Sequence, residues 1–320
     1  MVSVKHVEET LDPTDWNTIK KLGYKMVDDV VAYHKKSREL PLWQPIPEDV
    51  LEKFKEPVPK NPEGAEKTYQ DFHKLVQHNS LFNTHPRFWG FVVGTGNIMG
   101  AYADLWTATL NSAVEGAYQL PYFFEIQALD WMKEMLGYPK ESGGIFVSGG
   151  TIANLTGLIV ARNQNTSYNI REKGLQSLGN KLTIYGSVEM HSCHQKNCEI
   201  LGIGNENLRR IPTDHEYGIK VELLKEKIRE DRENGFEPIC VIGNAGTVNT
   251  GAFDDIEALA NLCEEENLWL HIDGAFGAWA AISPKLKHLV KGMDRADSVA
   301  FDLHKWMYMP YVIGCTLVRD

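Results

Sequence analysis

Near the amino terminus, apolar residues recur every three or four positions, with lysines and aspartates between them. The apolar positions are Ile19, Leu22, Met26, Val27, Val30 and Val31. This spacing predicts an amphipathic helix whose apolar face needs a partner, and Thr14, directly after Pro13, is placed to cap its first turn. The next segment, from Pro41 to Pro62, is rich in proline and charge and predicts an irregular connection rather than core.

From about Gly143 onward the pattern changes to short apolar runs that alternate with helical stretches. The expected strands are Ile145–Val147, Leu182–Tyr185, Ile239–Ile242, Leu268–Ile272, Ser298–Phe301 and Gly314–Val318. Strands that alternate with helices predict an α/β domain with a mainly parallel sheet covered on both faces. Ligands of such sheets bind beyond the carboxyl ends of the strands, so the polar residues after each run are the candidates for a site. We expect an N-terminal helical arm with its connection over residues 1–62 and a large domain over residues 63–320.

A glycine-rich turn, Ser148 to Thr151, follows the first of these strands and precedes a helical pattern that begins at Thr151. Glycines let the backbone approach an anion, and the free amides of a first helical turn can hold a phosphate. An ordinary tight turn with a threonine cap explains the same residues. Asp273 follows another strand, where a carboxylate can pair with a protonated pyridine nitrogen or, alternatively, cap a helix or form an ion pair.

Lys305, preceded by His304, follows the strand that ends at Phe301. A lysine beside apolar walls can lose its charge and form a Schiff base, although most lysines at strand ends are solvated. His191 follows a strand too, and its ring can stack on a planar group or lie uninvolved at the surface. A competing interpretation is a metal site formed by His191, Cys193, His194 and Cys198. The spacing of these four residues fits no usual zinc pattern, so we expect no metal. The order of these residues at successive strand ends indicates one site.

The composition narrows the classes of partner. Lys and Arg total 33 against 43 for Asp and Glu, a formal net charge of -10, and we find no basic stripe, so nucleic acid and anionic membranes are not expected. The 5 cysteines form no C-x-x-C pair, which predicts free thiols. The start of the chain, MVSVKHVEETLDPTDW, lacks the pattern of a signal peptide, and no apolar stretch is long enough to span a bilayer. We therefore expect a cytoplasmic protein.

Four motifs are similar to those of the pyridoxal-phosphate-dependent amino-acid decarboxylases, the group of the aromatic L-amino-acid, glutamate and histidine decarboxylases. They are H-P-R-F-W-G from His85, G-G-I-F-V-S-G-G-T-I-A-N-L from Gly143, H-I-D-G-A-F-G from His271 and S-V-A-F-D-L-H-K-W from Ser298. The resemblance implies the aspartate-aminotransferase fold, fold type I, with a mainly parallel seven-stranded sheet, an N-terminal helical arm and a small C-terminal domain. This sequence stops at Asp320, before that small domain, so the resemblance also implies a fragment or a truncated product.

The resemblance further implies a cofactor, pyridoxal 5'-phosphate, bound by the large domain. Lys305 would carry it as a Schiff base, Asp273 would bind the pyridine nitrogen and His191 would lie on the face of the ring, and these three are the expected catalytic residues. The other implied cofactor-binding positions are Gly150, Thr151 and His304 at the phosphate, Ala275 under the ring, and Thr247 near the hydroxyl or the substrate. Asp302 is a further candidate, but many relatives have asparagine there, so a phosphate contact would be absent or inverted in charge.

The implied function is decarboxylation of an L-amino acid to the amine and CO2. Phe88, Trp89 and Phe91 could wall an apolar site, which favours an aromatic amino acid, although aromatic clusters are more often plain core. The alternatives are a related pyridoxal-phosphate lyase or aldehyde synthase, and an inactive cofactor-binding truncated protein. The apolar face of the N-terminal helix, together with the resemblance, predicts a homodimer.

Overall fold

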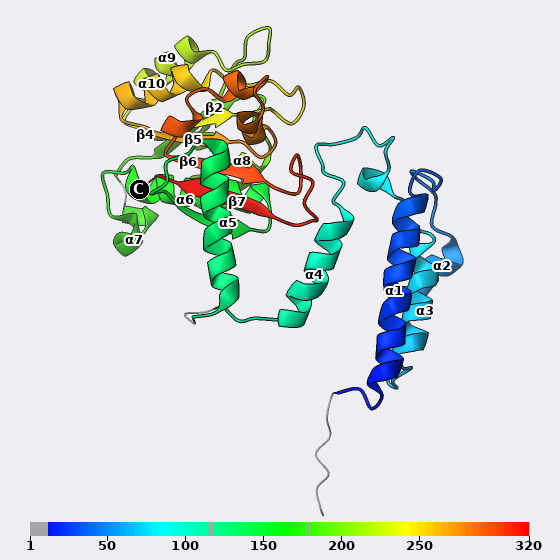
Figure 1. The fold of residues 1–320 in the computed structure, drawn as a ribbon. Coiled ribbons are helices and arrows are strands. Elements are labelled where there is room, and N and C mark those ends of the chain that lie inside the picture. The colour runs from blue at the N-terminus through cyan, green and yellow to red at the C-terminus, as the bar shows by residue number, and fades with distance from the viewer. Residues whose placement is uncertain (1–11, 115–117, 178, 320) are drawn as a thin grey trace, which may run out of the picture. The chain divides into compact units, whose positions relative to one another are not determined.

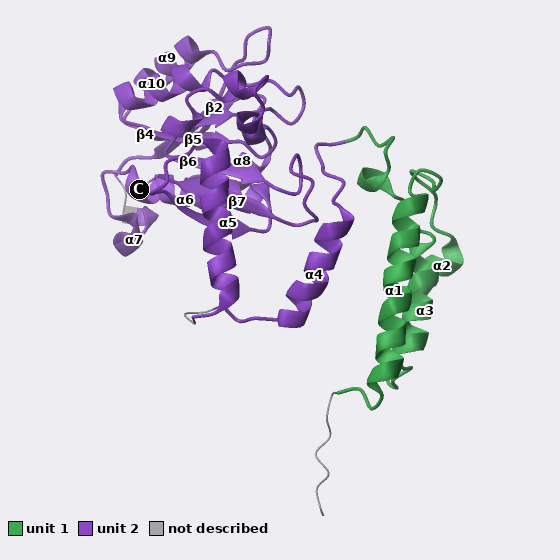
Figure 2. Ribbon diagram, viewed as in Figure 1, with its two compact units in different colours: residues 1–90 green, residues 91–320 purple. Residues whose placement is uncertain are grey.

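The computed structural model of the protein describes residues 12–114, 118–177 and 179–319, and the chain forms two compact units (Figure 2). Unit 1 spans Met1–Gly90 and unit 2 spans Phe91–Asp320. The segment 1–11, on which the expected absence of a signal peptide partly rests, lies outside the described residues. In the described part of the chain, no helix is both long and apolar enough to span a bilayer.

Unit 1 is helical (Figure 1). Its elements are α1 (Trp16–Lys36), α2 (Glu48–Lys53), α3 (Ala65–Val76) and the 3-10 turn η1 (Phe82–Thr84). The expected amphipathic helix is present as α1, but the cap prediction was one residue early: the side chain of Asp15, not Thr14, accepts a hydrogen bond from the backbone N–H of Asn17 at 2.9 Å. A carboxylate caps well because it also complements the positive end of the helix dipole.

The segment from Pro41 to Pro62 is not irregular throughout, because it contains α2. Pro47 directly precedes this helix, and two acidic residues, Glu48 and Asp49, occupy its first turn. A proline before a helix costs no hydrogen bond, and acidic residues are favourable at this end, so proline and charge here start a helix rather than prevent one.

Unit 1 continues beyond the sequence boundary placed between residues 62 and 63. The phenol of Tyr69 in α3 donates a hydrogen bond of 2.8 Å to Asp29 in α1, and the amide of Asn79 lies 3.4 Å from the hydroxyl of Tyr33. These contacts make α3 part of the N-terminal unit rather than of the large domain.

Unit 2 is an α/β structure (Figure 1). Its strands are β1 (Gly143–Val147), β2 (Leu182–Ser187), β3 (Leu208–Ile211), β4 (Glu237–Asn244), β5 (Trp269–Asp273), β6 (Ser298–Asp302) and β7 (Gly314–Val318). Its α-helices are α4 (Ile98–Leu110), α5 (Leu120–Leu136), α6 (Gly150–Gln164), α7 (Ile170–Lys173), α8 (Cys193–Ile200), α9 (Val221–Glu233) and α10 (Ile256–Glu266). Its 3-10 segments are η2 (Leu175–Ser177), η3 (Asn205–Asn207), η4 (Gly277–Ile282), η5 (Lys287–Val290) and η6 (Met293–Arg295).

The strands form one 7-stranded sheet in the order β1-β7-β6-β5-β4-β2-β3. The pairs from β6 to β3 are parallel, whereas β7 runs antiparallel to both β6 and β1. The predicted mainly parallel, seven-stranded sheet is therefore confirmed. Each predicted strand is present, and β3 is an additional edge strand.

Helices cover both faces of the sheet. Successive side chains of a strand point to opposite faces, so neighbouring residues of one strand show which helices pack on each face. In β4, Val241 belongs to a core cluster with residues of α5, α9 and α10, whereas its neighbours Cys240 and Ile242 belong to a second cluster with residues of α6 and α8. All three side chains are 0% exposed. The buried strands therefore end at fixed positions between two helical layers, and the residues that follow them are held there.

Candidate functional site

A cavity of about 450 Å³ in unit 2 lies at the carboxyl ends of the central strands. Its lining includes all the predicted site residues except Asp302: Gly150, Thr151, His191, Thr247, Asp273, Ala275, His304 and Lys305. Strand ends and the turns after β1, β2, β4, β5 and β6 supply these residues. The structure thus brings together positions that are up to 155 apart in the sequence, from Gly150 to Lys305.

The turn between β1 and α6 forms one wall of the cavity. Gly149 has a φ of 129°, a value that side chains disfavour, and α6 begins at Gly150, one residue before the predicted start. A Cβ atom on Gly150 would lie 2.7 Å from Oδ2 of Asp302, so only glycine fits between the turn and that carboxylate. The first turn of a 15-residue helix therefore presents its free N–H groups to the cavity, an arrangement suited to an anion.

Asp302 lies directly beneath this turn, and its side chain is 1% exposed. Its Oδ2 atom forms an ion pair of 2.8 Å with Nζ of Lys305 and lies 3.8 Å from Nε2 of His304. Its Oδ1 atom has no hydrogen-bond partner among the described residues. Burial raises the pKa of the Asp302 carboxyl, although the charge of Lys305 acts in the opposite direction. The lysine amine is thus held at the cavity by a buried carboxylate.

Asp273 ends β5 and presents its carboxylate to the same cavity. Its Oδ1 atom accepts a hydrogen bond from the backbone N–H of Ala275 at 3.1 Å, and its Oδ2 atom lies 2.8 Å from Nε2 of His194. Burial alone would raise the pKa of this carboxyl, but the hydrogen bond and charge of His194 outweigh it, and the pKa lies well below its ordinary value. Asp273 therefore offers a fixed negative charge to a cationic group in the cavity.

A layer of buried polar residues behind Asp273 was not predicted from the sequence. His194 is 0% exposed, and so is His271, whose Nε2 lies 2.8 Å from Oδ1 of Asn154 and whose Nδ1 lies 2.8 Å from Oγ of Ser298. Burial lowers the pKa of His271 to about 3, so this ring is neutral. In the sequence, His194 stands in the polar run around His191, where its spacing indicates only the metal interpretation.

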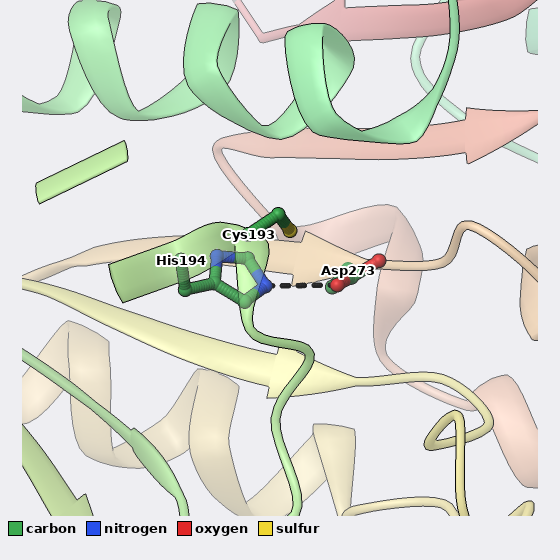
Figure 3. A group of neighbouring side chains, drawn as sticks. All are labelled: Cys193, His194 and Asp273. Atoms are coloured by element: carbon green, nitrogen blue, oxygen red, sulfur yellow. Dashed lines mark hydrogen bonds and ion pairs between the residues drawn. The ribbon is translucent and has the colours of Figure 1, made fainter. Parts of the chain in front are cut away.

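Figure 3 shows how Cys193, His194 and Asp273 converge. Their potential ligand atoms lie within 4.8 Å of one another. Cys198, the other cysteine of the metal interpretation, is instead buried in the apolar cluster with α6. Burial raises the pKa of the Cys193 thiol far above its ordinary value, which disfavours the thiolate that binds metals. Within this group, His194 and Asp273 are joined by a hydrogen bond.

The remaining candidates, His191, Thr247 and His304, line the cavity as well. His191 is exposed and its Nδ1 accepts a hydrogen bond of 3.1 Å from the backbone N–H of Cys193. The hydroxyl of Thr247 is 2.6 Å from that of Thr250. The ring of His304 lies 4.3 Å from that of Tyr311, measured between centroids.

The three aromatic residues expected at the substrate fall in different units. Phe91 lines the cavity. Phe88 and Trp89 belong to unit 1, where Phe88 lies edge-on to the ring of Phe82 and Trp89 is 92% exposed.

Comparison with known proteins assigns this arrangement to a family. The model of the pyridoxal-dependent decarboxylase conserved domain matches residues 47–320. Among curated proteins, an aromatic-L-amino-acid decarboxylase of Bacillus atrophaeus is 36% identical over 309 residues, which cover 94% of this chain and 62% of the relative. A phenylacetaldehyde synthase of Arabidopsis thaliana is 27% identical over 327 residues, covering 98% of this chain and 65% of that protein.

Solved structures show the same architecture. The tryptophan decarboxylase of Catharanthus roseus, solved with L-tryptophan, superposes with a TM-score of 0.85 at 26% identity, covering 96% of this chain and 67% of that one. The tryptophan decarboxylase of Oryza sativa, solved with pyridoxal phosphate and tryptamine, has a TM-score of 0.87 at 25% identity, covering 97% of this chain and 66% of that one. This chain spans 60%, 62% and 63% of the lengths of three of its curated relatives.

Proposed function

The chain belongs to the pyridoxal-dependent decarboxylase family, and we propose that it binds pyridoxal phosphate through Lys305 and that the protein decarboxylates an aromatic L-amino acid to the amine and CO2. The observation that carries this proposal is the placement of Lys305 and Asp273 on one cavity, beside the start of α6. An amine, a carboxylate and a set of free backbone N–H groups then face the same small volume.

The residues present fit this cofactor. The glycine turn leaves room for a phosphate at the start of α6, where a Cβ on Gly150 would close the space. Lys305 is 22% exposed, so its amine is accessible from the cavity although it is paired. The carboxylate of Asp273 supplies a counter-charge for a protonated ring nitrogen. We assign Gly150, Thr151 and His304 to the phosphate side and Ala275 to the ring, as the resemblance implies.

The bound cofactor supplies a ring that accepts the electrons released when a bond at the substrate's α-carbon breaks. Asp273 would hold a proton on the nitrogen of this ring, because a buried carboxylate with a low pKa favours a cationic partner. Lys305 would supply the amine that binds the cofactor, and His191 would contact the ring. Thr247, whose hydroxyl is held by that of Thr250, would lie near the hydroxyl of the cofactor or near the substrate.

Asp302 differs from an asparagine at this position in the charge that it can place near the phosphate. Its Oδ1 atom is buried without a partner, and its Oδ2 atom is paired with Lys305. A carboxylate there repels a phosphate unless its charge is neutralised, and the ion pair of 2.8 Å with Lys305 supplies a neutralising charge. We therefore place Asp302 at the cofactor as a group that responds to the charge of Lys305.

Support for an aromatic substrate comes from the names of the relatives and from Phe91 at the cavity. A second candidate is an aldehyde synthase, which the similarity to a phenylacetaldehyde synthase favours. Incubation of the pure protein with L-tryptophan, L-tyrosine and L-phenylalanine, followed by product analysis, separates the two reactions. An amine supports the decarboxylase and an aldehyde supports the synthase. A protein that binds the cofactor but forms neither product is the inactive alternative.

We also propose a homodimer in the cytoplasm. None of the residues of α1 is buried, and its apolar positions remain exposed: Ile19, Met26, Val27 and Val30 are 36% to 39% exposed. A two-fold partner could cover this face. The 5 cysteines are free and buried, which suits a reducing compartment.

Borohydride reduction of the protein with pyridoxal phosphate, followed by peptide mapping, tests the covalent site. We expect the label on Lys305 and its loss in Lys305→Ala. Lys196→Ala is the matched control, because Lys196 is an exposed lysine near the cavity that does not line it. Label that persists in Lys305→Ala, or that maps to another lysine, would overturn the assignment.

A further inference from the structure

The imidazole of His194 is completely buried behind the carboxylate of Asp273. His194 lies in the first turn of α8, and its Nε2 atom is 2.8 Å from Oδ2 of Asp273 (Figure 3). Its Nδ1 atom has no hydrogen-bond partner among the described residues. Among the described residues, the contact with Asp273 is therefore the one hydrogen bond of this ring, and it joins α8 to the end of β5.

We propose that His194 is a positioning residue, which fixes and charges the carboxylate of Asp273 so that this group can hold the proton on the ring nitrogen of the bound cofactor. The inference rests on the proposed function and deepens it, because Asp273 acts on the cofactor and His194 acts through Asp273.

The hydrogen bonds of Asp273 leave it a defined orientation. The N–H of Ala275 binds Oδ1 from the following turn, and His194 binds Oδ2 from the neighbouring helix. Two donors from different elements oppose rotation of the carboxylate, which lines the cavity. Without His194 the carboxylate would keep only the backbone donor.

His194 also has an electrostatic effect on Asp273. Burial raises the cost of charging a carboxyl group, and Asp273 is 7% exposed. A hydrogen-bond donor to the charged form offsets this cost. The charge of Lys305 also lowers the pKa of the Asp273 carboxyl, but by less than the hydrogen bond from His194 does. His194 is therefore the side chain that does most to maintain the charge of Asp273.

The second buried histidine does not compete for Asp273. The rings of His194 and His271 lie edge to face at 6.5 Å between centroids, and His271 is already held at both nitrogens by Asn154 and Ser298. His271 thereby fills the space beside His194 and limits its movement. This packing leaves Nε2 of His194 directed at Asp273.

Two substitutions separate the donor from the packing. Gln places an amide N–H close to the position of Nε2 and should preserve the hydrogen bond, whereas Leu has similar bulk and no donor. We expect His194→Leu to weaken pyridoxal phosphate binding by roughly tenfold or more, the effect of one lost hydrogen bond to a charged group, and His194→Gln to stay within about threefold of the native protein. Cys198→Ala, a buried change elsewhere in α8, controls for general weakening of the helix.

The decisive readout is the protonation of the ring nitrogen. The 15N chemical shift of bound, ring-labelled pyridoxal phosphate should report a protonated nitrogen in the native protein and in His194→Gln, and should move toward the unprotonated value in His194→Leu. A native shift in His194→Leu would overturn the proposal, and so would loss of the protonated signal in His194→Gln with the fold intact by circular dichroism. Failure of the native protein to bind the cofactor would instead refute the proposed function, so the two failures are distinct.

Discussion

The Oδ2 atom of Asp302 lies 2.8 Å from Nζ of Lys305, and the Asp302 side chain is 1% exposed. Because burial raises the pKa of this carboxyl, the folded protein holds its proton more tightly than the unfolded chain does. A carboxyl whose pKa is raised by folding contributes stability at low pH, and this contribution is lost as the pH rises through the folded pKa. The pair therefore carries a pH-dependent cost that an asparagine at position 302 would not.

The first prediction concerns this pH dependence. The free energy of unfolding of the native protein, relative to Asp302→Asn, should be largest below about pH 4 and should fall as the pH rises, by at most about 1.4 kcal/mol per pH unit. Urea unfolding of both proteins between pH 4 and pH 8 measures it. A difference that does not change with pH would contradict the prediction.

Asp231 is the matched control with the opposite sign. Burial alone would raise its pKa, but hydrogen bonds from Arg209 and Tyr185 lower it. Its contribution to stability should therefore be present above about pH 4 and be lost as the pH falls. Asp231→Asn should cost about 2 kcal/mol at pH 7 and less in acid.

The second prediction uses the close approach at the turn before α6. Gly150→Ala should weaken pyridoxal phosphate binding, because the new Cβ would lie 2.7 Å from Oδ2 of Asp302 and 3.3 Å from Cβ of Ala275. Spectrophotometric titration with the cofactor measures the change. Gly23→Ala, in the middle of α1 with no atom within 4 Å of its Cβ, is the control. It should stabilise unit 1 by about 0.5 to 1 kcal/mol and leave cofactor affinity unchanged.

The third prediction concerns Asn154, which is 1% exposed and holds His271 at 2.8 Å. Asn154→Ala leaves Nε2 of His271 buried without a partner and should cost about 1 to 3 kcal/mol in the free energy of unfolding. Thr156→Ala removes a hydrogen bond within the same helix, from its hydroxyl to the carbonyl of Ile152, and should change stability by less than about 0.5 kcal/mol. Equal effects of the two changes would argue against a role for the buried pair.

The fourth prediction concerns assembly. Light scattering at low concentration should give a dimer for the whole chain and a monomer after removal of the residues before Pro41, because α1 carries the exposed apolar face. As a milder test, Val27→Lys should weaken the dimer, whereas Lys35→Ala at the far end of α1 should not. A monomeric whole chain, or a truncated chain that dimerises equally well, would exclude this helix as the dimer interface.

The sequence predicted what depends on local pattern. The strands were apparent from their apolar runs, but β3 was missed because its sequence, Leu208-Arg209-Arg210-Ile211, has charged residues at its centre. Such residues are tolerated because β3 pairs with only one neighbour, β2. The ends of the strands could be located from the same runs. Because the sheet is mainly parallel, those ends meet at one edge, and most candidate residues therefore line one cavity.

The hydrogen bonds behind the site could not be predicted in this way. Asn154 and His271 are 117 positions apart, and His194 and Asp273 are 79 apart. Which polar side chains meet in the interior depends on how α6 and α8 pack on the sheet. Neither periodicity nor turn chemistry carries that information. Asp302 was identifiable by its position, but its unpaired oxygen was not.

The antiparallel β7 has a consequence for the order of folding. Its pairing with β6 closes only the short loop 303–313, whereas its pairing with β1 must close the chain from 148 to 313. Closing a longer loop costs more entropy, and sequence-distant pairings slow folding. β1 should therefore join the sheet late, and the anion site at the start of α6 cannot form before β1 is in place. Competence to bind pyridoxal phosphate should accordingly appear among the last events of refolding, after most of the helical signal has returned.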